Sequence, residues 1–162
     1  MKVVALDPGG TTGWAVYCDE VAERDAKRAH SPQLFLPGFY CGEFRKSNHH
    51  EELFDWLAFE HTHDTTVVCE SFEFRQNRQR DNINLMSKEY IGVTKLFGQT
   101  HAVPVVFQTA ALGKGFVTDQ KLKAMSLWSP GNKHAMDAMR HLVYFLINKK
   151  GRTDLVTLWQ NL

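Results

Sequence analysis

The feature that most constrains the fold of this 162-residue chain is an Asp-Pro-Gly-Gly turn that ends a short apolar run near the N-terminus. Residues 2–6 have the length and apolar character of a buried strand ending at Asp7, and residues 14–17 predict a second strand after the turn. Residues 39–44 alternate between apolar and polar side chains and predict a third. Because no helix is expected between these strands, they are expected to form an antiparallel meander.

The hydrophobic pattern changes to helical spacing after residue 44. It predicts further elements in this order: helix 48–61 with Asn48 as cap, strand 65–69, helix 82–99, strand 103–107, helix 118–127 and helix 133–148. Long loops are expected over 18–37, which is polar and charged, and after 107, where glycines occur. The tail over 151–162 has no clear pattern. The order predicts one α/β domain over residues 1–162, whose five-stranded mixed sheet (three antiparallel strands, then two parallel) is flanked by helices.

Acidic residues end two of the predicted strands. If the strands that end in Asp7 and Glu70 are neighbours, about 4.8 Å apart, the two carboxylates repel each other unless a proton or a cation is shared. His134 and Asp137, three residues apart, share one face of the last helix. Oxygen ligands with an added imidazole suit Mg²⁺ or Mn²⁺, and two such ions can promote phosphodiester hydrolysis. Alternatively, each acid is a strand-end or surface residue with no shared role.

Charge is distributed unevenly along the chain, although the net charge is only +1. Residues 1–70 carry 6 Lys and Arg against 12 Asp and Glu, whereas residues 71–162 carry 13 against 6. The basic half favours an acidic partner, with nucleic acid as the first candidate. Alternatively, the two halves intermix in three dimensions and their fields cancel.

Aromatic and cationic residues suited to an opened nucleic acid follow Glu70 directly, because rings stack on bases and guanidinium groups pair with phosphates. These candidate DNA-binding residues are Phe72, Phe74, Arg75, Arg78 and Arg80. Each Phe can equally pack into the core. Lysines around the predicted 118–127 helix either neutralise a phosphate or lie on a solvated helix face. They are Lys114, Lys121, Lys123 and Lys133.

Three segments together resemble the RuvC-type Holliday-junction resolvases of the RNase H-like superfamily: ALDPGGTTGWAVY at 5–17, VVCES at 67–71 and KHAMDAMRHLVYFL at 133–146. That family has a first strand ending in Asp-x-Gly, a fourth strand ending in Glu and a last helix reading Asp/His-x-x-Asp-Ala. Residues 84–107 and 117–125 resemble the family's long helix with its following strand and its short basic helix. The resemblance covers nearly the whole chain apart from the 18–37 segment and the C-terminal tail.

The resemblance implies a metal-dependent endonuclease that cuts branched DNA, most of all Holliday junctions, and leaves a 5′-phosphate and a 3′-hydroxyl. Its cofactor would be Mg²⁺ or Mn²⁺, with two ions per site. The residues that would bind the metal and carry catalysis are Asp7, Glu70, His134 and Asp137. His134 stands where some members carry a carboxylate, which leaves the number and preference of the ions open. Lys114 and Lys121 are the lysines favoured for catalysis, and the 82–99 helix would join two copies into a homodimer.

Other functions fit the sequence less well or remain as alternatives. The DPGGTTGW turn also resembles the phosphate-binding turn of sugar kinases and heat-shock ATPases, but these bind their nucleotide between two such domains and need a much longer chain. A flap- or fork-specific DNA nuclease, an RNase, and a catalytically idle branched-DNA-binding module remain open.

Composition indicates the compartment. Three cysteines without a CxxC pair fit a reducing compartment, and no apolar run approaches the ~20 residues of a membrane helix, so a cytoplasmic protein without membrane contact is expected. Four histidines lack the partners of a metal site and are expected at the surface: His49, His50, His61 and His63.

Overall fold

The computed structural model describes residues 1–27, 36–45, 49–71 and 86–160. Its centre is one five-stranded sheet in the order β3-β2-β1-β4-β5. The strands are β1 (Lys2–Asp7), β2 (Thr12–Cys18), β3 (Phe39–Phe44), β4 (Thr65–Ser71) and β5 (Val105–Thr109). β1, β2 and β3 pair antiparallel, β4 pairs parallel with β1, and β5 pairs parallel with β4. The mixed sheet predicted from the sequence is confirmed.

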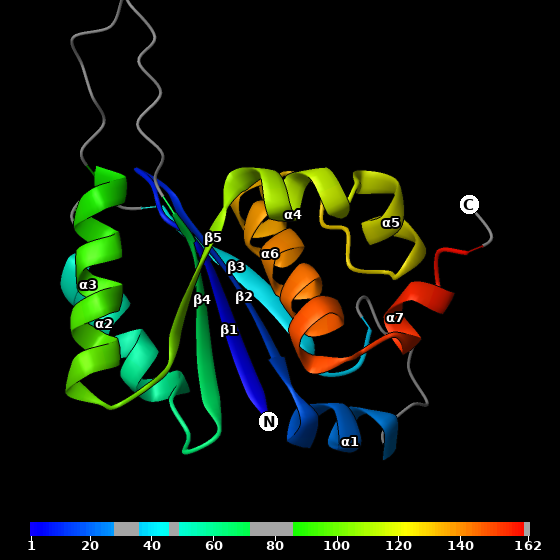
Figure 1. The fold of residues 1–162 in the computed structure, drawn as a ribbon, viewed down its shortest axis with the longest axis horizontal. Helices are drawn as coiled ribbons and strands as arrows, with labels where there is room; N and C mark the ends of the chain where they lie inside the picture. The colour runs from blue at the N-terminus through cyan, green and yellow to red at the C-terminus, as the bar shows by residue number, and fades with distance from the viewer. Residues whose placement is uncertain (28–35, 46–48, 72–85, 161–162) are drawn as a thin grey trace, which may run out of the picture.

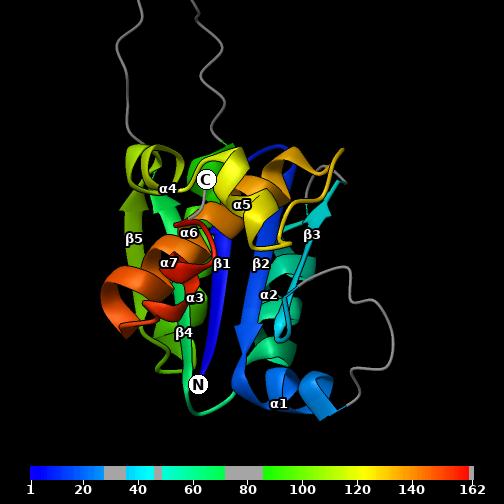
Figure 2. The ribbon, with the colours of Figure 1, turned by 90° about the vertical axis from the view of Figure 1, so that its right-hand side faces the viewer.

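Helices cover both faces of the sheet (Figure 1). One face carries α6 (Lys133–Lys150) with the short helices α4 (Ala110–Phe116), α5 (Asp119–Ala124) and α7 (Asp154–Thr157). The opposite face carries α2 (His50–Glu60) and α3 (Met86–Thr100). α1 (Asp19–Lys27) follows β2 at the end of the sheet remote from α4 (Figure 2). Within the described part of the chain, no helix is both long and apolar enough to cross a membrane.

β1 contributes side chains to both hydrophobic cores, because successive residues of a strand point to opposite faces. Val3 and Ala5 belong to the core beneath α6, whereas Val4 and Leu6 belong to the core beneath α2 and α3. All four side chains are fully buried. Burial on both faces explains the continuous apolar run in the sequence, which ends at Asp7.

The start of α6 lies directly against β2, and Gly13 permits this approach. A Cβ atom at position 13 would lie 2.0 Å from the carbonyl oxygen of His134, a distance that no side chain tolerates. Thr12 stabilises the glycine-rich turn between β1 and β2, since its hydroxyl donates to the carbonyl oxygen of Gly9 at 3.2 Å. The glycine-rich turn therefore brings the first turn of α6 close to the end of β1.

Two helices lie where the sequence predicts loops. α1 occupies part of the predicted 18–37 loop, and acidic residues in its first turn, Asp19 and Glu20, stabilise the helix N-terminus. The polar residues of α1, which predicted a loop, belong to a helix at the surface. α4 lies in the glycine-containing segment after β5. Its Gly113 is required by packing, because a Cβ there would lie 2.9 Å from the ring of His141 on α6.

The start of α2 also differs from the prediction. The helix begins at His50 with His49 at its N-cap, whereas Asn48 lies outside the described residues. The surface prediction for His49 is wrong, because its side chain is buried. Its ring stacks on Tyr90 with centroids 4.0 Å apart, and its Nε2 lies 2.8 Å from the Thr12 hydroxyl. The ring contact and the hydrogen bond together offset the cost of burying this polar imidazole.

Candidate active site

Two carboxylates lie where β1 and β4 end. The two strands are parallel neighbours with Leu6 opposite Cys69, so Asp7 and Glu70 occupy the next position on each strand. Asp7 is only 7% exposed, and Glu70 is half-buried. The sequence left open whether these strands are neighbours. The structure shows that they are, so the two acids lie at one edge of the sheet.

The first two turns of α6 bring a histidine and a third acid to the same edge. The Nδ1 atom of His134 lies 2.9 Å from Oδ2 of Asp7. Asp137, one turn later, is buried, and its Oδ2 lies 3.1 Å from the ammonium nitrogen of Lys114 on α4. The same nitrogen lies 3.5 Å from Oε2 of Glu70. We call Asp7, Glu70, His134 and Asp137 the acidic cluster.

Asp7 binds its proton more tightly than an ordinary aspartate. Burial and the negative charge of Glu70 raise the pKa of Asp7 to about 6, although the hydrogen bond with His134 and the charge of Lys114 oppose this rise. A buried carboxylate beside a second carboxylate is stabilised in its ionised form by a shared cation. The pair of strand-end acids therefore has the electrostatic character of a cation site.

Glu70 is held by a histidine that none of the recognised motifs singles out. His141 is fully buried, and its Nε2 lies 2.8 Å from Oε2 of Glu70. Burial pushes the pKa of Glu70 upward, but the hydrogen bond from His141 and the charge of Lys114 outweigh this effect, so the pKa lies below its usual value. The sequence does carry a signal, because His141 follows Asp137 by four residues and shares its helix face.

Gln108 completes the support of Glu70. The two residues are paired in the parallel register of β4 and β5, and Gln108 is almost fully buried. Its Oε1 lies 2.8 Å from Nδ1 of His141, which fixes the imidazole so that Nε2 faces Glu70. The predicted strand ends at residue 107, one position too early to include this side chain.

The structure separates the two lysines favoured for catalysis. Burial would lower the pKa of Lys114, but Glu70 and Asp137 raise it above its usual value. The ammonium of Lys121, on α5, instead donates to the carbonyl oxygen of Phe116 at 2.7 Å and lies 4.8 Å from the ring centre of Trp159. Lys114 therefore contacts the acidic cluster. Lys121 does not, because its ammonium is already bound by the Phe116 carbonyl and lies over the Trp159 ring.

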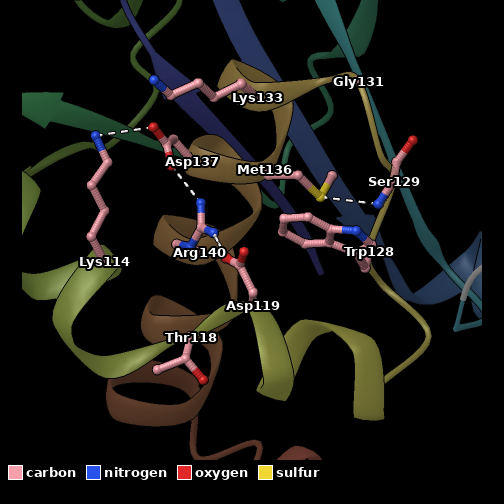
Figure 3. A pocket seen from close by; sticks show the side chains of 10 residues that line it. All are labelled: Lys114, Thr118, Asp119, Trp128, Ser129, Gly131, Lys133, Met136, Asp137 and Arg140. Atoms are coloured by element: carbon pink, nitrogen blue, oxygen red, sulfur yellow. Dashed lines mark hydrogen bonds and ion pairs between the residues drawn. The ribbon is translucent and has the colours of Figure 1, made fainter.

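Asp137 has a second cationic partner, Arg140. Two nitrogens of Arg140 bind Asp137 and Asp119, and its Nε donates to the carbonyl oxygen of Val117 at 3.1 Å. Figure 3 shows the guanidinium group between the two carboxylates. One oxygen of Asp137 is therefore bound by Arg140 and the other by Lys114. The spacing of three residues between Asp137 and Arg140 is the signal that the sequence offers.

A residue of β3 fixes the first turn of α6. Oε1 of Glu43 accepts hydrogen bonds from the backbone N–H groups of His134, at 3.0 Å, and Ala135, at 3.4 Å. These N–H groups have no partner within the helix, and a carboxylate at a helix N-terminus is electrostatically favourable. Glu43 therefore sets the position of His134 relative to Asp7. Nothing local in the sequence indicates this contact.

The chemistry of the acidic cluster fits a divalent cation. Carboxylate oxygens that repel each other, with an imidazole beside them, are ligands suited to Mg²⁺ or Mn²⁺. Among the residues that the structure describes, no three His, Cys, Asp or Glu side chains are arranged to hold a metal ion. Asp137 is instead bound by Lys114 and Arg140. A cation shared by all three acids therefore requires Lys114 to exchange its contact with Asp137.

The other predicted DNA-binding residues fall into two groups. Lys123 on α5 is exposed, with its nitrogen 5.2 Å from the ring centre of Trp128, and Lys133 is exposed on the rim of a cavity beside the acidic cluster. The aromatic and basic residues that follow Glu70 lie outside the described residues: Phe72, Phe74, Arg75, Arg78 and Arg80.

Solved structures share this fold over nearly the whole chain. A structure of Thermus thermophilus RuvC in complex with a Holliday junction substrate matches 94% of this chain and 97% of its own, with a TM-score of 0.63 and 14% sequence identity. Another T. thermophilus RuvC structure matches 93% of this chain and 96% of its own, with a TM-score of 0.59 and 13% identity. No family model and no curated protein sequence matches the chain. The sequence motifs predicted the fold of the RuvC-type resolvases, the RNase H-like fold, and these matches confirm that fold.

Proposed function

We propose that this protein is a metal-dependent endonuclease that hydrolyses phosphodiester bonds in branched DNA, with the four-way junction as its principal substrate. The observation that carries the proposal is the convergence of Asp7, Glu70 and Asp137, with His134, at neighbouring strand ends. A RuvC structure with the same fold contains a Holliday junction, which supports the choice of substrate. The activity would be that of a crossover junction endodeoxyribonuclease acting in recombination and repair.

The acids of the cluster would hold the cofactor through their carboxylate oxygens. Asp7 and Glu70 contribute from the sheet, and Asp137 contributes from α6, where His134 offers a ring nitrogen as a further ligand. When bound, two Mg²⁺ or Mn²⁺ ions would supply an activated water and stabilise the leaving oxygen. The softer imidazole of His134 makes Mn²⁺ a suitable ion.

Neighbouring side chains would support the reaction in different ways. The alternative role of His134, which lies beside Asp7, would be to orient the attacking water or accept its proton instead of binding the metal. Lys114 contributes a positive charge that would pair with an oxygen of the scissile phosphate once its contact with Asp137 is exchanged. The hydrogen bond from His141 keeps Glu70 ionised and oriented.

We further propose that the protein acts as a homodimer, because a four-way junction has two-fold symmetry and paired nicks need two active sites. α3 and the edge strand β5 offer the contact surface. Leu96 of α3 is 56% exposed and Phe107 of β5 is 38% exposed. The proposed dimer would cover both of these exposed apolar side chains.

A cleavage assay on the full chain tests this proposal. Four-way junctions, forks, flaps, linear duplex and RNA–DNA hybrids are compared with Mg²⁺, with Mn²⁺ and with EDTA, and Asp7→Asn controls for contaminating nucleases. We expect junctions to be cut fastest, in paired nicks that ligase can seal, and no cleavage in EDTA. Faster cutting of flaps, forks or hybrids would replace the proposed substrate. Junction binding without cleavage under any metal would favour a catalytically idle binding module.

A further inference from the structure

A cavity of about 770 Å³ opens beside the acidic cluster, between α4, α5 and the start of α6 (Figure 3). This volume lies within the range of about 300–1,000 Å³ that is usual for sites of organic ligands. Lys114 and Asp137 line the cavity and also belong to the candidate active site. A ligand in the cavity would therefore lie next to the phosphate that the acidic cluster is proposed to cleave.

One wall of the cavity is an indole ring with cations nearby. Trp128, in the segment between α5 and α6, is half-buried and lines the cavity. The nitrogen of Lys123 lies 5.2 Å from its ring centre, and the guanidinium carbon of Arg140 lies 6.0 Å from it. Both cations lie over the ring, and Lys123 is exposed. A base would stack on the indole in place of the Lys123 ammonium, which would then attract the phosphate.

Hydrogen bonds hold the segment that carries Trp128 against α6. The backbone N–H of Ser129 lies 3.2 Å from the sulfur of Met136, and the amide of Asn132 donates to the hydroxyl of Ser129 at 2.9 Å. Gly131 lines the cavity without a side chain, and even a Cβ atom there would meet open space. These contacts hold the backbone of this segment in place, and Gly131 leaves space beside it for a ligand.

Charge favours a phosphodiester strand at the entrance. Arg140 binds both acids of the lining, Asp119 and Asp137, and thereby offsets their negative charge. Lys133 lies exposed on the rim near the start of α6. We propose that the cavity receives the base of an unpaired nucleotide next to the scissile phosphate, and that Trp128 stacks on this base.

This inference rests on the proposed nuclease function and deepens it by naming the part of the substrate that is recognised. In an intact duplex, a base next to the cut is paired and stacked, whereas a branch point can release one. The cavity would therefore favour branched DNA over linear duplex through the energetic cost of freeing the base.

The test is a double-mutant cycle between Trp128 and the base. Trp128→Leu keeps an apolar side chain in the wall but removes the ring, and Trp128→Phe keeps a ring. Trp159→Leu is the matched control, because Trp159 is also half-buried beside a lysine but does not line the cavity. Binding is measured in an Asp7→Asn background, on junctions that carry one abasic residue at each position around the cut.

Loss of stacking predicts that Trp128→Leu weakens binding of the intact junction about tenfold or more, whereas Trp128→Phe weakens it much less. At one abasic position, Trp128→Leu should cause no further loss, because the ring has no base to contact. Trp159→Leu should bind as the unchanged protein does. Melting temperatures verify that each variant is folded.

Two outcomes would overturn the inference. One is that the losses from Trp128→Leu and from base removal multiply at every position, and the other is that Trp159→Leu causes the same loss as Trp128→Leu. If Trp128→Leu does not fold, the abasic junctions are tested with Trp128 in place. The proposal is contradicted if no abasic position weakens binding. Cleavage without coupling would leave the proposed function standing and remove this site. Coupling between Trp128 and one base position, without cleavage under any divalent ion, would support this site and contradict the proposed nuclease function.

Discussion

His141 and Glu70 form a partly buried hydrogen bond of 2.8 Å that ties α6 to β4 at the candidate active site. Gln108 of β5 holds the other ring nitrogen of His141, also at 2.8 Å. Gly113 lies against the same ring, so His141 also limits how closely α4 and its Lys114 approach. One imidazole therefore joins the elements that carry the charged groups around Glu70.

Replacing His141 by Leu should lower junction cleavage about 10- to 100-fold, which is usual when a group that orients a metal ligand is removed. Glu70 would lose its donor, so the Mn²⁺ concentration for half-maximal rate should rise as well. His101→Leu is a control for loss of a histidine hydrogen bond, because His101 is partly buried and hydrogen-bonded but follows α3, away from the acidic cluster. An unchanged metal titration in His141→Leu would show that Glu70 does not depend on this contact.

The metal-free protein should gain stability when Asp7 is replaced by Asn. The pKa of Asp7 is raised from 3.8 to about 6, so the folded state binds this proton more tightly than the unfolded chain does. Ionisation of Asp7 therefore destabilises the fold as the pH rises from about 4 to about 6. The shift corresponds to at most about 3 kcal/mol, and the weaker interaction of Asn with His134 reduces the expected gain to about 1–2 kcal/mol.

Urea unfolding in EDTA measures this gain at two pH values. Asp7→Asn should be the more stable protein at pH 7.5, and the difference should be much smaller at pH 4, where Asp7 of the folded protein is protonated and its destabilising charge is gone. A variant that is equally or less stable than the unchanged protein at pH 7.5 would show that Asp7 is not under repulsion.

His134 should influence the choice of metal. An imidazole in place of a carboxylate makes the site softer and one charge less negative, so Mn²⁺ should support cleavage at least as well as Mg²⁺. His134→Asp should shift the preference toward Mg²⁺. Rates measured over both ions provide the test, and a profile unaffected by the substitution would place His134 outside the ligand set.

The basic segment after Glu70 should account for part of the salt dependence of DNA binding. The slope of log K against log[salt] should fall by roughly 0.9 for each phosphate on the duplex arms that the protein no longer neutralises. Joint replacement of Arg75, Arg78 and Arg80 by Ala should therefore reduce this slope and weaken binding most at low salt. Binding titrations over a salt series measure it, with the melting temperature as control. An unchanged slope would exclude these residues as phosphate ligands.

Much of the candidate site could be predicted because local rules determine it. The apolar runs predict that β1 and β4 each end at an acid, so Asp7 and Glu70 meet once the two strands are parallel neighbours, as the structure shows. The spacing of His134 and Asp137 gives them one helix face. These arguments need only the period of each element and the direction of each strand.

The rest depends on contacts between distant segments. Glu43 and His134 are 91 residues apart and meet only because β3 passes the start of α6. His141 lies on the buried, largely apolar face of α6, where a histidine cannot be distinguished from a core residue until its partners are known. Gly113 weakens the helical pattern of α4, although the fold needs a glycine there to accept the His141 ring.

The most direct test of the central claim is the rate of four-way junction cleavage by the unchanged protein and by Asp7→Asn, under Mg²⁺, Mn²⁺ and EDTA, with junction binding measured in parallel. Removal of a metal ligand takes away several kcal/mol of transition-state stabilisation, so we expect Asp7→Asn to cut at least about 10³-fold more slowly while it binds junctions normally. The unchanged protein should cut with either ion and not in EDTA. Near-normal cleavage by Asp7→Asn with Mg²⁺ would contradict the assignment of the acidic cluster as the catalytic centre.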